Sequence, residues 1–598
     1  MDNLLKKINK GHIIFVLYPI LLFYITAFMT YNPFVRTKWR AQTLNLILFE
    51  VFAVFLLVII GNAVIALRVE IILALVISIA NYYVLSFRSS PIVPWDLFSM
   101  GTAASVAGSY NYMLPFRQIF LIALMIAMIV TARFAKLKMN RKYWLLRAAA
   151  GVVCICITCG ITWVVHQEKY VNKLQLYPFL FTPTVMYERN GFVVTFLIDL
   201  QYLSVDKPEG YSKESAQELL DAQEGLSWTA DTNELTDAVS TDGEKNAELP
   251  NVIVVMDEAF SDLGVLTDFT TDEDYMPFMH SLEAGAENTV TGKLNVSVKG
   301  GNTANTEYEF LTGNSMAYLP AGSIPYQQYV KNEIPSLASY FKSIGYDTYA
   351  MHPYLAAGWN RDKVYPLMGF DEFLSLDSFA GASYVRDYVD DSSCVDKIIE
   401  LYGNKKTGKP AFIFNVTMQN HSPYTDGYYD SKNSISVDGT FSVQLNEYLS
   451  LIKLSDAALE KLITYFEGQE EPTVVVFFGD HQPSDTVAEP VWNLKGMHSN
   501  NLTDEQNQLR YEVPYVIWAN YDIREASDVD SSANYLAAQM MEYAGIPMSQ
   551  YQEYLLQTAE QMPVISTQYT EDKGSEVWNE YQILQYYLMF DYSKEDAQ

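Results

Sequence analysis

Long apolar runs occupy the first part of the chain and predict membrane-spanning helices. Crossing the hydrocarbon core takes about 20 residues, and five runs reach or approach that length. We place them at His12–Tyr31, Thr43–Leu67, Val69–Phe87, Gln118–Phe134 and Leu146–His166. Only Arg68 separates the second run from the third, so these two should form a tight hairpin. Apolar runs this long and numerous are rare in soluble proteins, so we expect a membrane domain of five helices at residues 1–167.

Basic residues in the loops indicate how these helices are oriented, because they favour the cytoplasmic side. Three lysines at positions 6–10 precede the first run, and six lysines and arginines at positions 133–147 surround the loop before the last one. Five spans put both clusters on the same side. Three basic residues at positions 36–40 would then lie outside, but they are outnumbered. We therefore predict a cytoplasmic N-terminus, with everything after the last span outside the cell.

The pattern changes twice after the last apolar run. Residues 168–204 mix aromatic and polar side chains, which is typical of an amphipathic connector at the membrane surface. Lys207–Glu248 is rich in Asp, Glu, Ser and Thr and indicates a linker, with one helix near Ser212–Gln223. We interpret residues 168–248 together as an interfacial connector and acidic linker.

From Pro250 onward, short apolar runs alternate with amphipathic helical stretches, the pattern of an α/β domain. Continuous apolar strands indicate a mostly parallel sheet with both faces covered. We assign residues 249–566 to this domain and the acidic, aromatic residues 567–598 to a C-terminal tail. The predicted strands are Asn251–Met256, Asp347–Met351, Ala411–Val416, Thr473–Phe478 and Tyr515–Ala519, and helices are expected at Pro277–Gly285, Ser336–Ser343 and Asn446–Gly468.

Polar residues follow four of these strands. The first strand leads into Asp257-Glu258, the second into His352, the third into Asn420-His421 and the fourth into Asp480-His481. In open α/β sheets, ligands bind at the carboxyl ends of the strands. One such residue alone would be an ordinary polar side chain at a strand end. Four strands that end this way together indicate a functional site.

A glycine-rich segment, Lys299–Glu307, carries a candidate nucleophile. Gly300 and Gly301 allow a tight turn or a close approach to a ligand. The residues that follow, through Thr312, can form a helix with Thr303 near its N-terminus, where backbone N–H groups favour a phosphate. A threonine hydroxyl beside a divalent cation can lose its proton and attack phosphorus. Taken alone, Thr303 would equally fit an ordinary helix cap.

Charge and cysteine content separate the two halves of the chain. Up to Ser204, 18 lysines and arginines stand against 7 acidic residues, whereas the remainder has 22 against 63, so the net charge of −30 belongs to the second half. Such acidity argues against nucleic acid as a partner. The acidic half contains one cysteine, Cys394, so it forms no internal disulfide, and no zinc-type cysteine spacing is present.

Taken in order, these motifs resemble the lipoteichoic acid synthase family, which belongs to the alkaline phosphatase and sulfatase superfamily. The segments that carry the resemblance are NVIVVMDEAF, GGNTANTEYEF, HPYLAAGWNRDKVY, NVTMQNHSPY and FFGDHQP, behind five apolar runs and a linker that includes KPEGYS. The resemblance covers nearly the whole chain. It implies a polytopic helical membrane domain followed by an extracellular sulfatase-like α/β domain.

The resemblance also implies roles for individual residues. Thr303 would be both nucleophile and metal ligand, and the remaining ligands would be Glu258, Asp480 and His481. The metal would be Mn²⁺, with Mg²⁺ as a substitute. The substrate head group would be bound by His352, Trp359, Arg361 and His421. Asp257 is set aside because neighbouring strand residues point to opposite faces.

The substrate implied is phosphatidylglycerol, from which glycerol phosphate would pass through Thr303 to a polyglycerol phosphate chain or a glycolipid, leaving diacylglycerol. The residue types suit this chemistry. Hydroxyl, carboxylate and imidazole ligands fit manganese or magnesium. Arg361 offers a planar fork for two phosphate oxygens. His421 can move a proton to the leaving oxygen or from the acceptor.

Several alternatives stay open beside this hypothesis. A sulfatase is disfavoured, because Thr303 is followed by Ala-Asn-Thr rather than by the Pro and Arg of the sulfatase pattern. A phosphoethanolamine transferase would share the threonine, but the single Cys394 does not fit its disulfides. A phosphoglycerol transferase that decorates a glucan would share donor and chemistry.

Two alternatives belong to other functional classes. A non-catalytic receptor would be expected to have lost one of the four ligands. A transporter would need more ionisable residues in its spans than Glu50 and Glu70, and Glu70 is expected near a membrane boundary.

Overall fold

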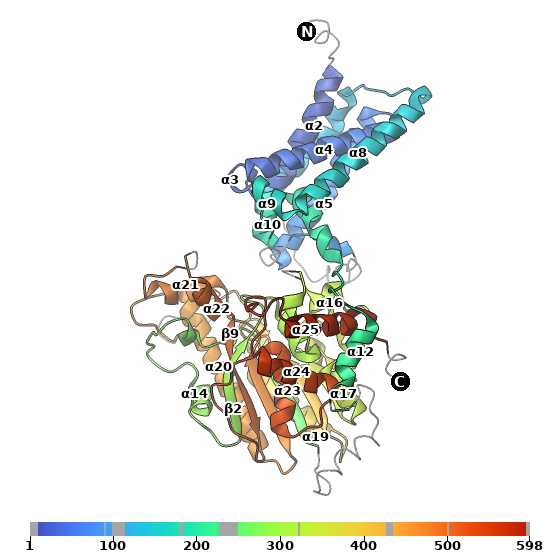
Figure 1. Ribbon diagram of the computed structural model, residues 1–598. Coiled ribbons are helices and arrows are strands. Elements are labelled where there is room, and N and C mark those ends of the chain that lie inside the picture. The colour runs from blue at the N-terminus through green and yellow to red at the C-terminus, as the bar shows by residue number, and fades with distance from the viewer. Residues whose placement is uncertain are drawn as a thin grey trace. The chain divides into compact units, whose positions relative to one another are not determined.

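The computed structural model describes residues 10–88, 91–97, 114–178, 183–223, 225–226, 249–320, 323–425, 434–498 and 501–593. The chain divides into two compact units (Figure 1). The first covers residues 1–205 with 321–323, and the second covers residues 206–320 and 324–598. Each unit has hydrophobic clusters of its own.

The first unit contains five helices long and apolar enough to cross a membrane, which confirms the predicted membrane domain. They are α2 (Lys10–Phe28), α4 (Trp39–Ile60), α5 (Ala63–Arg88), α7 (Phe116–Thr131) and α8 (Trp144–Val165). Helix α4 packs against α2, α5 and α8, and α7 packs against α2 and α5. Their outward faces expose large apolar side chains such as Val76 and Phe120, as expected for helices surrounded by lipid.

The hairpin between the second and third spans turns at Gly61 and Asn62, so the break predicted at Arg68 is wrong. Gly61 has a φ of 78° and ends α4 in the left-handed conformation that favours glycine. The Asn62 side chain accepts the backbone N–H of Val64 at the start of α5. Arg68 lies inside α5 and donates to the carbonyl of Ile129 on α7. The correction moves Glu70 from a membrane boundary into the body of a span.

Short helices after the last span belong to the core of the first unit. They are α9 (Glu168–Leu174), α10 (Pro183–Asn190) and α11 (Phe192–Asp199), and α3 (Pro33–Arg36) lies earlier in the chain. Met186, Val194 and Ile198 are buried in one cluster with Leu48 of α4. The Asn45 amide on α4 donates to the carbonyl of Asn190 at 2.7 Å. These contacts fix α10 and α11 against the spans.

The second unit is built on an eight-stranded sheet of order β10-β2-β9-β8-β1-β7-β3-β4. Its strands are β1 (Asn251–Asp257), β2 (Thr289–Asn295), β3 (Asp347–Met351), β4 (Glu372–Leu374), β7 (Ala411–Val416), β8 (Thr473–Gly479), β9 (Glu512–Ala519) and β10 (Ser531–Ser532). Only β9 pairs antiparallel, with β2 and β8. The mostly parallel sheet is therefore confirmed. A small hairpin of β5 (Tyr384–Val385) and β6 (Tyr388–Val389) stands apart.

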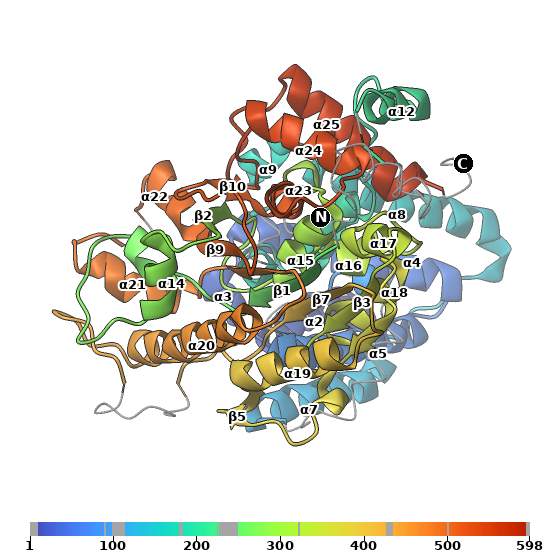
Figure 2. The same ribbon diagram turned by 90° about the horizontal axis from the view of Figure 1, so that it is seen from below.

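Helices cover both faces of this sheet (Figure 2). On one face α14 (Pro277–Glu283), α19 (Asp391–Asn404), α20 (Val443–Glu467) and α21 (Asp485–Asn493) enclose a core with Ile253, Val475 and Phe477. The other face holds α15 (Thr303–Thr312), α16 (Pro325–Gln328), α17 (Leu337–Ser343), α18 (Arg361–Leu367) and α23 (Ala533–Ala544). There Phe310 stacks with Phe414, their ring centroids 5.8 Å apart.

A further cluster joins segments from both ends of the second unit. Helix α12 (Lys213–Asp221), expected near Ser212–Gln223, buries Ala216 and Leu220 against α24 (Gln550–Gln561) and α25 (Glu576–Tyr586). Trp578 and Tyr581 of α25 are also buried. Part of the stretch interpreted as a linker, and the described part of the stretch interpreted as a tail, thus contribute to one core.

Candidate active site

Parallel pairing brings the carboxyl ends of β1 and β8 together. Asp257 pairs with Gly479, so the next residues, Glu258 and Asp480, leave the sheet side by side. His481 follows, and single ligand atoms of Glu258, Asp480 and His481 lie within 4.8 Å of one another. His481 Nε2 is 3.3 Å from Asp480 Oδ2 and 3.8 Å from Glu258 Oε1. All three side chains are buried.

Helix α15 adds the fourth predicted ligand. It begins at Thr303, whose hydroxyl donates to Glu258 Oε2 at 3.3 Å. One turn later, Thr306 Oγ1 donates to the backbone carbonyl of Asp480 at 2.7 Å and ties the helix to the end of β8. Thr303 is the first helical residue, and Asn302 occupies the cap position without a capping bond from its side chain. The Thr303 hydroxyl is therefore directed to the cluster and does not act as a helix cap.

The backbone around this cluster adopts costly conformations. Ala259, directly after Glu258, has a φ of 54°, and Asn302, directly before Thr303, has a φ of 69°. Each such residue costs about 1–3 kcal/mol unless its surroundings hold it in place. One restraint is the Ala259 N–H, which donates to Asp480 Oδ1 at 2.7 Å. Gly479 is also required, because a Cβ there would lie 1.8 Å from the carbonyl oxygen of Phe260.

The cluster fits a divalent cation by its donor atoms. His481 Nδ1 lies 2.9 Å from the carbonyl of Gln482 and donates to it, which leaves the lone pair on Nε2 facing the carboxylates. Within the described part of the chain, His481 Nε2 and Asp480 Oδ2 are buried without a hydrogen-bond partner. Burial and the neighbouring Asp480 raise the pKa of Glu258 above its ordinary value. A cation among these atoms would remove the mutual repulsion of facing acceptors.

Asp257 points away from this cluster into a second buried network. Its Oδ2 accepts the hydroxyl of Thr417 at 3.2 Å, and its Oδ1 accepts the amide of Asn420 at 3.1 Å. The Thr417 hydroxyl also accepts the backbone N–H of Glu258 at 3.0 Å. The Asn420 amide also donates to the hydroxyl of Ser455, and the Ser455 hydroxyl donates to Asp391. Asn420 was among the polar residues expected at the strand ends, whereas Thr417, which directly follows the same strand, was not.

Arg361, predicted to grip phosphate, is buried and paired with Glu307 of α15. Its Nε donates to Glu307 Oε1 at 3.0 Å and to Oε2 at 3.1 Å, and Nη2 also donates to Oε1. Tyr365 donates to the same carboxylate at 2.6 Å. Arg361 also lies near enough to Glu258 to favour its ionised form. The guanidinium is therefore held in position by an acidic partner that the sequence left undetermined.

The two predicted histidines lie close enough to interact with each other, but in different environments. His352 is buried, with Nδ1 3.0 Å from the carbonyl of Val416, and burial lowers its pKa well below the ordinary value. His421 is half-buried, with Nδ1 2.8 Å from the carbonyl of Ser422 and 3.3 Å from the hydroxyl of Tyr388. Burial also lowers the pKa of His421. Both rings are therefore neutral near pH 7.

Trp359 is not part of the four-residue cluster. It is half-buried in the turn η8 (Gly358–Asn360) that precedes Arg361. Trp359 and Asn360 have φ values of 54° and 61°. Left-handed conformation at a tryptophan is uncommon, so the turn is held by its surroundings.

Comparison with known proteins places this site in a family. Residues 250–546 match the family model described as Sulfatase. A Rhizobium meliloti protein assigned to cyclic beta-1,2-glucan modification is 30% identical over 482 residues, which cover 78% of this chain and 71% of that protein. Lipoteichoic acid synthase 1 of Bacillus subtilis is 23% identical over 279 residues, which cover 46% of this chain and 42% of that protein.

A solved structure shares the fold. The Streptococcus pyogenes phosphoglycerol transferase in complex with sn-glycerol-1-phosphate superposes with a TM-score of 0.52 at 22% identity, covering 64% of this chain and 95% of that one. With the strand-end cluster inside the matched segment, the chain belongs to the sulfatase family of the alkaline phosphatase and sulfatase superfamily, and its relatives include lipoteichoic acid synthase 1.

Proposed function

We propose that this protein is a membrane-anchored phosphoglycerol transferase with its catalytic unit outside the cell and its N-terminus in the cytoplasm. It takes glycerol phosphate from phosphatidylglycerol, holds it on Thr303 and passes it to an acceptor hydroxyl. The observation that carries the proposal is the Thr303 hydroxyl, 3.3 Å from Glu258 in a buried cluster with Asp480 and His481. This hydroxyl caps no helix and instead donates to a carboxylate of the cluster.

The reaction proceeds in two displacements. The Thr303 hydroxyl loses its proton and its oxygen forms a bond to phosphorus as the bond from phosphorus to the diacylglycerol oxygen breaks, and that leaving oxygen takes up a proton. The acceptor oxygen then attacks the same phosphorus, loses its proton, and releases Thr303 as the free hydroxyl. A covalent intermediate of this kind divides one difficult transfer into two easier steps.

The proposed cation is Mn²⁺, with Mg²⁺ as the substitute, because hydroxyl and carboxylate oxygens suit these hard ions. Glu258, Thr303, Asp480 and His481 would hold it. When bound, such a cation withdraws charge from a phosphoryl oxygen and favours the deprotonated form of a hydroxyl.

The remaining residues bind the donor and move protons. His421 is neutral and half-buried, so it can take the proton of the acceptor hydroxyl and, once charged, return a proton to a leaving oxygen. Arg361, fixed by Glu307, contributes positive charge beside the phosphoryl group. His352 and Trp359 border the head group of the lipid.

The acceptor has two candidates. A polyglycerol phosphate chain or its glycolipid anchor is supported by the resemblance to lipoteichoic acid synthase 1. A glucan is supported by the Rhizobium meliloti relative, which is 30% identical and is assigned to cyclic beta-1,2-glucan modification.

The test uses purified full-length protein, fluorescent phosphatidylglycerol and Mn²⁺. We expect release of fluorescent diacylglycerol, and a loss of at least about a thousand-fold in Thr303→Ala. Thr303→Ser, which keeps a hydroxyl, should retain measurable turnover and accumulate a phosphorylated peptide detectable by mass spectrometry. Undiminished release by Thr303→Ala would refute the nucleophile. Cleavage of phosphatidylethanolamine alone would replace the proposed donor and favour a phosphoethanolamine transferase.

A further inference from the structure

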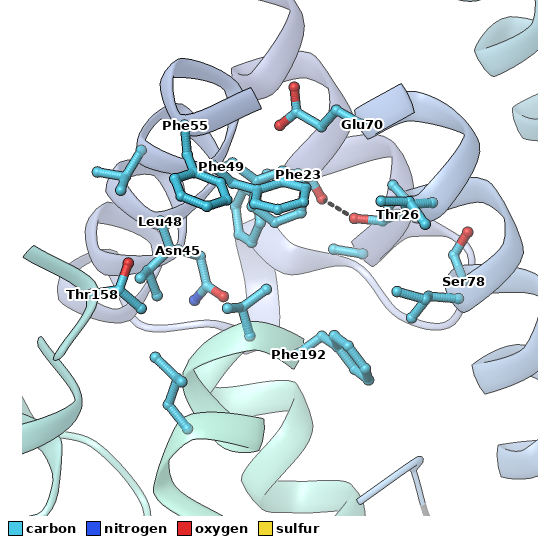
Figure 3. Close-up of a pocket in the computed structure, with 18 of the residues that line it drawn as sticks. Phe23, Thr26, Asn45, Leu48, Phe49, Phe55, Glu70, Ser78, Thr158 and Phe192 are labelled. Carbon is cyan, nitrogen blue, oxygen red and sulfur yellow. Dashed lines mark hydrogen bonds between the residues drawn. The ribbon is translucent and has the colours of Figure 1, made fainter. Parts of the chain in front are cut away.

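The membrane unit contains a cavity of about 420 Å³ that the proposed chemistry does not use (Figure 3). Small-molecule sites typically measure about 300–1,000 Å³. Its walls come from α2, α4, α5, α8, α10 and α11, and all of its lining residues lie between Phe23 and Leu197. The cavity therefore belongs to the first unit alone.

The wall of this cavity is almost entirely apolar, and its rim faces outward. Phe23, Phe49 and Phe55 gather on one side of it in Figure 3. On the rim, Phe52 of α4, Leu73 of α5 and Ile155 of α8 are 39%, 43% and 51% exposed. These three helices are membrane spans, so the exposed rim faces the lipid. The molecules that can enter from this side are those dissolved in the bilayer.

One polar group in the wall is left without a hydrogen-bond partner. Glu70 is 2% exposed, and neither of its carboxyl oxygens has a partner among the described residues. Two other polar side chains of the wall do have partners, since Asn45 donates to the carbonyl of Asn190 and Asn81 accepts the N–H of Ile92. Glu70 lies seven residues into α5, about 10 Å from its start. An ionisable group at that depth is costly and usually functional.

The charge around Glu70 restricts the ligand. The described residues that line the cavity include no lysine, arginine or histidine. Glu50 of α4 adds a second carboxyl close enough to interact with Glu70 electrostatically. A phosphate would have no counter-charge there. A neutral lipid hydroxyl can both donate to and accept from a carboxyl group, and it needs no charged head group at the membrane surface.

We propose that this cavity binds diacylglycerol, with one acyl chain along the aromatic wall and the glycerol hydroxyl bonded to Glu70. The second chain stays at the rim among bilayer lipids. Binding as such depends only on the membrane unit. The further idea that the cavity takes up the diacylglycerol released by the reaction rests on the proposed function.

The test is photo-crosslinking of diacylglycerol that carries a diazirine in one acyl chain. Full-length Thr303→Ala protein in nanodiscs is labelled, and labelled peptides are mapped by mass spectrometry. We expect label in α4, α5 and α8. Because the variant is inactive, the labelling reports binding without turnover. A negative transferase assay would therefore not change the labelling result, and a negative labelling result would not contradict the transferase activity.

Variants on one helix provide the matched controls. Ala74→Phe fills the cavity and should abolish specific labelling, whereas Val76→Phe, at a side chain 61% exposed on the same helix, should leave it unchanged. Glu70→Leu should weaken diacylglycerol binding about five-fold, the effect of one lost hydrogen bond, and Glu70→Gln should restore most of it. Equal labelling of Ala74→Phe and its parent would overturn the site. Equal competition by phosphatidylglycerol would overturn the preference for a neutral lipid.

Discussion

Asp257 and Glu258 are adjacent acidic residues at the end of one strand, yet they lie in opposite kinds of environment. The Asp257 carboxylate accepts hydrogen bonds from Thr417 and Asn420. The Glu258 carboxylate faces Asp480 and His481, which keep buried atoms without partners among the described residues. The alternation of side chains along a strand separates the two. We call the Asp257 side, whose carboxylate is hydrogen-bonded by the protein itself, the completed side, and the Glu258 side, whose donor atoms fit a cation, the open side.

The largest expected effect is the loss of metal binding on the open side. A ligand that binds only the folded protein stabilises it by about 2.7 kcal/mol at 100 times its Kd, so Mn²⁺ should raise the Tm of the parent protein. Glu258→Gln should abolish this rise and lower Mn²⁺ affinity at least about 100-fold, a larger loss than changes in residues that only orient the ligands cause. The readout is thermal unfolding with and without Mn²⁺, together with equilibrium dialysis.

Asp257→Asn is the matched control for that experiment. It disturbs the bonds from Thr417 and Asn420, so it should lower the Tm in the absence of metal, but the additional rise with Mn²⁺ should remain. If the two variants lost the Mn²⁺ response equally, the division into an open and a completed side would be wrong.

The Arg361–Glu307 pair tests whether buried charge near the site serves stability or catalysis. Arg361→Ala leaves Glu307 buried without its counter-charge, which should cost about 3–5 kcal/mol of unfolding free energy. The double variant Arg361→Met/Glu307→Leu removes both charges and should recover most of that loss. Denaturant unfolding measures the stability, and lipid cleavage measures the function. Recovered stability without recovered cleavage would assign Arg361 to the reaction, whereas recovery of both would limit Arg361 to a structural role.

A smaller loss of Mn²⁺ affinity is expected at Thr417, which connects the completed side to the open side. The Thr417 hydroxyl joins them, because it donates to Asp257 and accepts the N–H of Glu258. Thr417→Val preserves the shape and removes both bonds, so Glu258 should lose its orientation and Mn²⁺ affinity should fall about 10–100-fold. Thr417→Ser keeps the hydroxyl and should bind Mn²⁺ like the parent. Unchanged affinity in Thr417→Val would show that the network does not position the ligand.

Sequence patterns predicted much of this arrangement. The strands that end near Asp257, Val416 and Gly479 were recognised as apolar runs, and the ends of parallel strands lie at the same edge of a sheet. Strand β2 was missed because Gly292 and Lys293 interrupt its apolar pattern, and Gly292 is required since a Cβ there would lie 2.0 Å from the carbonyl oxygen of Val529. Such a contact is invisible in local sequence, as is the antiparallel direction of β9.

The partners of buried charged residues could not be predicted from the sequence either. Glu307 and Arg361 are 54 residues apart, and no local pattern in either segment indicates that they pair. In the membrane unit the charged Arg68 was taken as the hairpin break, but the actual turn depends on a glycine with a positive φ and an asparagine cap. That error had displaced Glu70 to a membrane boundary.

A last effect, on the pH dependence of stability, is expected at Asp391, which Ser455 connects to Asn420 on the completed side. Burial raises the pKa of Asp391 above its ordinary value, so the folded protein keeps a proton that the unfolded chain releases. Above the ordinary pKa of an aspartic acid, rising pH therefore favours unfolding until the raised pKa is passed. Asp391→Asn removes this dependence, so the variant should lose less stability than its parent between pH 4 and pH 8. Denaturant unfolding of the variant and its parent across this range measures the difference. Parallel stability curves would show that Asp391 is ionised in the folded protein, and the network would then need a cation of its own, like the open side.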